Sequence, residues 1–169
     1  MIKEKLGWPR LGLIIFLLFI IVGLNGLIIQ KELLLAQGEP VYWGLLPIDP
    51  RSLIQGDYMI LRYEFVDGGV DATHWPQNGQ IAVQLNPQRI VTDIRLHTAN
   101  QPLGPNEIIW NYQRISNNEI KIGANSFLFQ EGLASLYDQA EYAEFRVTPN
   151  GDSLLVDLRD ENLRLLQPQ

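Results

Sequence analysis

The sequence predicts a mainly β protein, in which an N-terminal transmembrane helix is followed by a compact β-barrel or β-sandwich domain with one short helix. Three observations support this fold class. An uncharged apolar run covers residues 11–29. From residue 40 onward, short apolar runs alternate with Pro, Gly, Asn and Asp at intervals typical of an all-β domain. The pattern changes to helical spacing in one place, residues 132–142.

The apolar run is long enough to cross a bilayer. As a helix, its nineteen residues would rise about 28 Å, close to the roughly 30 Å of the hydrocarbon layer. A cleaved signal peptide would have a shorter apolar region followed by small residues, so an uncleaved anchor is favoured over that alternative. The chain then divides into a cytoplasmic tail (1–10), a transmembrane helix (11–29), a linker (30–39) and an extracytoplasmic β domain (40–169).

The charges beside the span predict its orientation. Lys3, Lys5 and Arg10 precede it, whereas Lys31 follows it and is offset by Glu32. Because positively charged flanks stay on the cytoplasmic side, the N-terminus is expected in the cytoplasm and the β domain outside it.

The span also carries residues suited to contact with another helix. Gly23 and Gly26 would allow close approach, and the Asn25 amide could hydrogen-bond across such an interface. A plain lipid-facing anchor is the alternative interpretation.

The composition of the remainder excludes several functions. Ten basic residues face eighteen acidic ones after the span, and the arginines are scattered singly, so no nucleic-acid partner is expected. The absence of cysteine excludes disulfides, thiolate metal sites and a cysteine nucleophile. His74 and His97 have no second ligand at metal spacing, so neither a metal nor a cofactor is predicted.

The β elements can be placed from alternation and turn residues. The clearest strand is 58–65, in which Met59, Leu61 and Tyr63 share one face. Two hairpins are expected, one joined at residues 86–87 and one at the Asn-Gly of residues 150–151. The predicted strands are 41–46, 58–65, 80–85, 90–96, 107–115, 120–122, 144–148 and 153–158, with 163–166 closing the sheet.

The most distinctive stretch is DPRSLIQGDY, residues 49–58. Gly56 allows a positive φ, and Asp57 can accept hydrogen bonds from the backbone of a turn. Arg51 can pair with Asp49 or Asp57. A turn that begins a strand is favoured over a binding site.

The same stretch resembles a known family. GDYMILRY, residues 56–63, fits all five fixed positions of the motif that names the bacterial GDYXXLXY proteins: Gly56, Asp57, Tyr58, Leu61 and Tyr63. The segments 47–51 and 123–132 also resemble the family. The resemblance implies a protein of the bacterial inner membrane without an established activity, and it suggests an integral membrane protein as partner.

No nucleophile and base can be paired in the sequence, so no catalytic residue is predicted. Membrane-bound signal peptidases also join one anchor to a β domain, but Ile48 stands where they carry their serine. Glu131, beside Phe127 and Phe129, is either a carboxyl with a raised pKa or an acid near the start of the following helix.

The favoured function is a membrane-anchored accessory or interaction module that is not an enzyme. Two alternatives stay open. One is a periplasmic hydrolase that uses acidic residues around Asp57 and Glu131. The other is a β domain that binds a small ligand or lipid in an apolar cavity.

Overall fold

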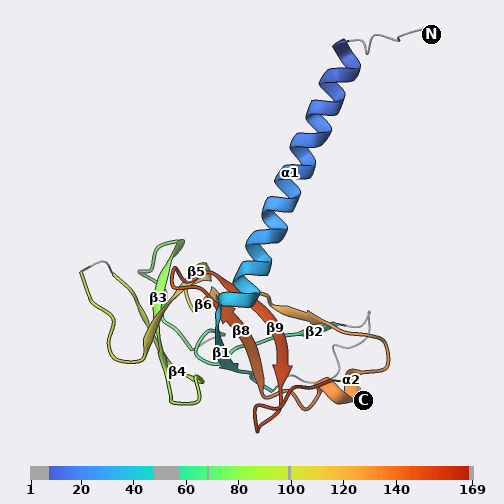
Figure 1. Cartoon of the computed structure of the whole chain (residues 1–169). Coiled ribbons are helices and arrows are strands. Elements are labelled where there is room, and N and C mark those ends of the chain that lie inside the picture. The colour runs from blue at the N-terminus through green and yellow to red at the C-terminus, as the bar shows by residue number, and fades with distance from the viewer. Residues whose placement is uncertain (1–7, 48–57, 68, 99, 168–169) are drawn as a thin grey trace, which may run out of the picture.

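The computed structural model describes residues 8–47, 58–67, 69–98 and 100–167, and all structural statements concern these residues. A long N-terminal helix stands clear of a β domain (Figure 1). In chain order the elements are α1 (Trp8–Gln37), β1 (Glu39–Gly44), β2 (Tyr58–Ile60), β3 (Asn78–Leu85), β4 (Val91–Leu96), β5 (Glu107–Ser116), β6 (Glu119–Lys121), β7 (Ser126–Leu128), α2 (Ala134–Tyr137), β8 (Tyr142–Val147) and β9 (Ser153–Arg159).

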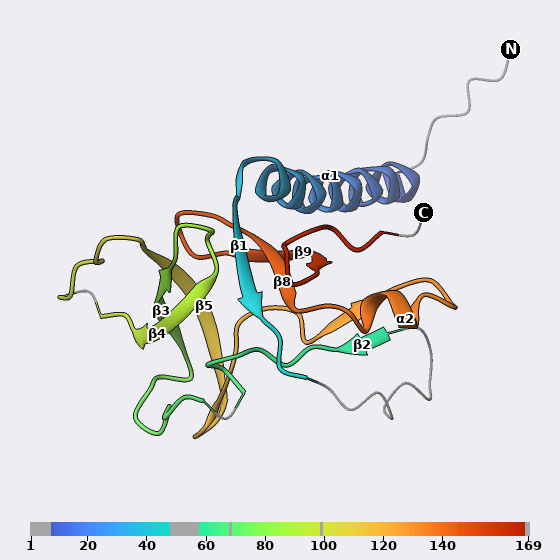
Figure 2. The same ribbon diagram turned by 90° about the horizontal axis from the view of Figure 1, so that it is seen from below.

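The strands form three antiparallel sheets, with the orders β1-β8-β9, β2-β7 and β4-β3-β5-β6. Figure 2 shows β1, β8 and β9 between the β3-β4-β5 side of the domain and the side that holds β2 and α2. Single bridges join the sheets, and they include Leu45 to Tyr63 and Asp67 to Glu119. The sheets therefore curve into a half-barrel around one core, which confirms the predicted fold class.

Aromatic side chains fill the core. Trp43, Trp110 and Phe145 are fully buried and meet edge to face, with ring centroids 5.3 Å apart in both the Trp43–Trp110 and the Trp110–Phe145 pairs. The Trp110 indole N–H donates to the Ile122 carbonyl at 2.7 Å. A Cβ at Gly123 would lie 2.7 Å from the Phe145 ring, so this glycine lets the chain pass close to the core.

Helix α1 runs almost directly into β1. The Gly38 N–H donates to the Leu34 carbonyl at 2.8 Å, and a Cβ at Gly38 would lie 2.5 Å from that same oxygen. Leu34 is buried, and the Arg146 guanidinium donates to the Gly38 carbonyl at 3.4 Å. Instead of the expected linker at 30–39, the chain is helical to Gln37 and extended from Glu39, because Leu34 packs the last turns of the helix onto the domain.

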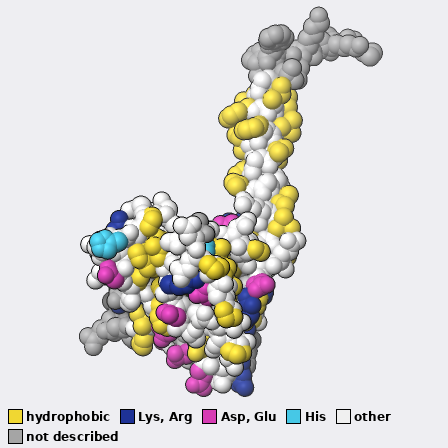
Figure 3. Space-filling model, turned by 90° about the vertical axis from the view of Figure 1, so that its left-hand side faces the viewer, with side chains coloured by type: hydrophobic (Ala, Val, Ile, Leu, Met, Phe, Trp, Pro, Cys, Tyr) yellow, Lys and Arg dark blue, Asp and Glu magenta, His cyan; other side chains and the backbone are white. Residues whose placement is uncertain are grey.

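The apolar part of α1 is long enough to cross a membrane. By length and composition, the candidate span within it is Gly12–Gln37, and none of its most apolar 18-residue window is buried in the protein. The space-filling view shows hydrophobic side chains over the visible face of this helix, away from the mixed charged surface of the domain (Figure 3). The helix is therefore a candidate membrane anchor or signal sequence.

Four elements differ from the sequence prediction. The strand expected at 58–65 ends at Ile60, because the chain turns where the Tyr63 N–H donates to Asp67 and Phe65 has a φ of 65°. The short strand β7 was not expected. The helix predicted over residues 132–142 contains only the single turn α2, and the C-terminal closing strand is a single bridge between Arg159 and Leu165.

Candidate functional site

The described part of the motif lies in a two-stranded ribbon, β2 and β7. Tyr58 pairs with Leu128 and Ile60 with Ser126. Beyond the ladder, the Leu61 N–H donates to the Asn125 carbonyl at 2.8 Å. The motif therefore pairs with the 123–132 segment, the other stretch singled out in the sequence, and the two form one structural unit.

One side of this unit is part of the core. Leu61 and Tyr63 are buried, and the Tyr63 ring lies 6.3 Å from Trp43 and 5.8 Å from Phe145, centroid to centroid. The Tyr63 hydroxyl donates to the Ala124 carbonyl. Burial, and secondarily the negative charge of a nearby carboxylate, raises the pKa of Tyr63, so the phenol keeps its proton and acts as a donor. The last two fixed residues of the motif thus hold the ribbon onto the core.

The other side of the ribbon faces solvent and is apolar. Tyr58, Ile60 and Leu128 are 40%, 43% and 78% exposed, and the Tyr58–Leu128 pair places two of them side by side. Ile60 is two residues further along the same strand and so shares this face. Among the described residues, Leu128 is the most exposed large hydrophobic side chain, above those of α1. We call Tyr58, Ile60 and Leu128 the ribbon patch.

The family model described as "GDYXXLXY protein" matches residues 20–158, which is most of the chain. The chain belongs to the GDYXXLXY protein family. Searches of curated proteins and of solved structures found no match. The family assignment therefore rests on the family model, whose description names no activity.

The other predicted motif residues of this GDYXXLXY protein, Asp49, Arg51, Gly56 and Asp57, lie outside the described residues. A binding or acidic site built from them stays a prediction.

Glu131 itself is exposed and lies in the turn that precedes Gly132, which has a φ of 86°. The Phe127 and Phe129 rings pack on Tyr137 of α2, with ring centroids 5.2 and 5.0 Å from the Tyr137 centroid. The aromatic residues near Glu131 in the sequence therefore fix α2 to the ribbon. The N-cap of α2 is Leu133, so Glu131 lies two residues before the cap and outside the first turn of the helix.

The three helix residues proposed for membrane contact are on the exposed surface of α1. The Asn25 amide donates to the carbonyl of Ile21, four residues earlier, at 2.8 Å. At about 100° per residue, Gly23 and Gly26 lie roughly 60° apart, whereas Asn25 points about 160° away from Gly23. The two glycines share a face, with open space around both, and Asn25 lies on another face.

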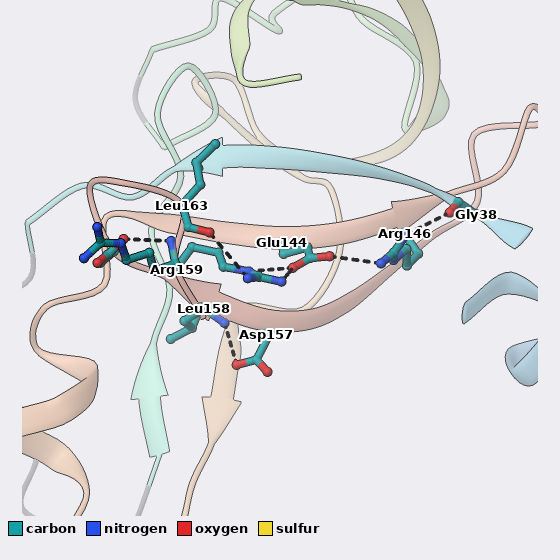
Figure 4. Close-up of polar contacts among 9 residues, drawn as sticks. Gly38, Glu144, Arg146, Asp157, Leu158, Arg159 and Leu163 are labelled. Carbon is teal, nitrogen blue, oxygen red and sulfur yellow. Dashed lines mark hydrogen bonds and ion pairs between the residues drawn. The ribbon is translucent and has the colours of Figure 1, made fainter. Parts of the chain in front are cut away.

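A buried ion-pair cluster was missed in the sequence. Glu144 of β8 is 2% exposed and pairs with the Arg159 guanidinium and, at 3.3 Å, with Arg146 (Figure 4). Asp157 is opposite Glu144 in the ladder, and burial raises its pKa against the opposing effects of the Leu158 N–H and Arg159. The sequence did hold a signal for this cluster: an acidic and a basic residue stand two positions apart in each strand of the hairpin, as Glu144 and Arg146 and as Asp157 and Arg159.

This cluster is suited to stabilisation. The Glu144 carboxylate is already occupied by two guanidinium groups, and removing a buried partner from such a set leaves charge uncompensated. Among the described residues, no group of three or more His, Cys, Asp or Glu is placed to hold a metal ion. The ribbon patch is one surface feature that packing of the core does not require.

Proposed function

We propose that this family member is a membrane-anchored accessory module, and that its β domain docks through the ribbon patch onto the extracytoplasmic part of another integral membrane protein. The patch is the observation that carries the proposal. Leu128 projects almost entirely into water at the position directly opposite the motif residue Tyr58. Contiguous exposed apolar side chains on a domain surface are typical of contact sites, because a partner that covers them removes apolar area from water.

The anchor supports a partner in the same membrane. An uncleaved α1 confines the domain to the bilayer surface. The extracytoplasmic parts of other integral membrane proteins lie at the same surface. The packing of Leu34 and the Gly38–Leu34 hydrogen bond support an uncleaved anchor, because cleavage after Ala36 would remove Leu34 from the domain.

The proposed topology is that of a single-pass protein of the bacterial inner membrane. It keeps the cytoplasmic tail at residues 1–10, the span at 11–29 and the periplasmic or extracellular domain at 40–169, with helix in place of most of the linker. Lys3, Lys5 and Arg10 on the N-terminal side support this orientation.

Photo-crosslinking in intact cells tests the proposal. A photoreactive residue at Leu128 of the full chain should give a crosslinked product with an integral membrane protein, and one at the exposed Thr92 of β4 should not, since β4 lies on the opposite side of the domain (Figure 2). A Tyr58→Ser change should weaken the Leu128 crosslink while the chain stays folded and in the membrane fraction.

Three results would contradict docking to another membrane protein. A product of twice the chain mass would mean that the patch binds a second copy. Crosslinks to lipid alone would mean that the patch faces the bilayer. Equal crosslinking from Leu128 and Thr92 would mean that the patch has no specific partner.

A further inference from the structure

A groove separates the end of α1 from the hairpin that joins β8 and β9. Figure 1 shows the base of α1 directly beside these strands. The groove has a volume of about 490 Å³, within the range of small-ligand sites. Its helix wall has the spacing of one helical face, and its lining residues include Gln30, Lys31, Leu34, Gln37, Asp152 and Ser153.

The position of this groove relative to the bilayer follows from the helix, if α1 spans the membrane as proposed above. With the hydrocarbon layer ending near Ile29 and a rise of about 1.5 Å per residue, Lys31 lies about 3 Å and Gln37 about 12 Å beyond it. The headgroup layer occupies roughly 5–8 Å on each side. The helix wall of the groove therefore lies within the headgroup layer at Lys31 and extends beyond that layer to Gln37.

Contacts between the end of α1 and the domain fix the distance of the groove from the hydrocarbon layer. Leu34 is buried against the domain, and Gly38 is hydrogen-bonded both to Leu34 and to Arg146 of β8. A site on the groove is thus held at headgroup level for as long as the chain is anchored.

The two walls of the groove carry opposite charges. Lys31 provides an ammonium group from the helix, and Asp152 provides a carboxylate from the hairpin. Two hydrogen bonds position Asp152: its Oδ1 accepts from Asn111 at 3.0 Å, and its N–H donates to Thr148 Oγ1 at 3.1 Å. One cation and one anion on facing walls match a headgroup that carries both a phosphate and an amine.

We propose that this groove binds the headgroup of a zwitterionic, amine-bearing phospholipid, with Lys31 on the phosphate and Asp152 on the ammonium group. Leu34, which is buried, and Leu33, which is half-exposed, add apolar surface to the lining, and the glycerol and upper acyl chain would contact them. An anionic lipid without an amine would pair with Lys31 but would meet the like charge of Asp152.

Lipid retention by the purified full chain tests the site. The chain in mild detergent is mixed with phosphatidylethanolamine or phosphatidylglycerol, and retained lipid is counted by native mass spectrometry. The wild type should retain phosphatidylethanolamine in preference to phosphatidylglycerol. Lys31→Gln and Asp152→Asn should each weaken retention of phosphatidylethanolamine by about tenfold, the effect of losing one charge-assisted contact.

The matched controls remove exposed charges elsewhere. Lys121→Gln on β6 and Asp93→Asn on β4 should retain lipid as the wild type does. The site is refuted if either groove variant retains phosphatidylethanolamine at the wild-type level, or if phosphatidylglycerol binds the wild type equally well. Thermal unfolding establishes that each variant is folded.

This outcome is separable from that of the docking proposal. Loss of lipid retention in the Lys31 variant should leave the Leu128 crosslink in place. Loss of the crosslink with normal lipid retention would refute docking and leave the groove site standing.

Discussion

Replacing Tyr63 by Phe should separate the structural half of the family motif from its exposed half. The change removes one hydroxyl and keeps the ring, so the aromatic contacts to Trp43 and Phe145 remain. It deletes the hydrogen bond from the Tyr63 hydroxyl to the Ala124 carbonyl. A lost hydrogen bond of this kind should lower the free energy of unfolding by about 1–2 kcal/mol.

For a domain of this size, that loss corresponds to a melting temperature lower by about 3–10 °C. The assay is thermal and denaturant unfolding of the full chain in detergent, followed by near-ultraviolet circular dichroism. Tyr58→Phe is the matched control, because it removes a hydroxyl from the half-exposed tyrosine of the same motif and should change stability by less than about 0.5 kcal/mol. The reasoning fails if the Tyr63 variant melts with the wild type, or if the Tyr58 variant is the less stable of the two.

The remaining predictions concern the ion-pair cluster and the helix junction. Glu144→Gln should lower the free energy of unfolding by about 2–4 kcal/mol, because Arg159 is left half-buried without its carboxylate. Because burial raises the pKa of Asp157, the folded state binds its proton more tightly, so stability should fall as pH rises from the ordinary carboxyl range through the raised pKa, and Asp157→Asn should remove that fall. Gly38→Ala should cost about 1–3 kcal/mol, because its Cβ would meet the Leu34 carbonyl oxygen.

Each of these has a matched comparison. Glu39→Gln removes an exposed ion pair with Arg89 and should cost less than about 1 kcal/mol; an equal loss in both glutamate variants would refute a special role for the buried cluster. The Asp157 variant should be more stable than the wild type at neutral pH and equal to it in acid, and the opposite order would contradict the sign of the shift. Gly23→Ala enters open space and should leave the unfolding of the domain unchanged.

Local patterns in the sequence were enough to predict most of the domain. The ends of β3, β4, β5 and β9 lie within two residues of their expected positions, because alternation and turn residues act locally. The strand at 58–65 was predicted too long, although Leu61 and Tyr63, predicted to share one face, are both buried. The chain turns there because Asp67 captures the Tyr63 N–H, a contact that alternation does not reveal.

The features that were missed depend on contacts between distant segments. β7 has three residues and exists because β2 pairs with it across more than sixty positions of the chain. Glu144 can be buried because Arg159 from the next strand forms an ion pair with its carboxylate. The composition of residues 30–39 could not predict the close junction at Gly38. That junction depends on the burial of Leu34, in the part of α1 that contacts β8 and β9.

One face of the ribbon is buried in the core and the other is exposed to solvent, so the motif residues on the two faces differ in their importance for folding. Leu61 and Tyr63 are explained by burial, so a motif defined by them alone would describe a folding unit. Tyr58 contributes 40% of its surface to solvent, beside the almost fully exposed Leu128, and the core does not require an aromatic ring there. A half-exposed tyrosine is compatible with a β-strand, so the Tyr58→Ser variant decides whether its ring has a role beyond the strand. The tyrosine at this position is therefore the part of the motif on which the docking proposal depends.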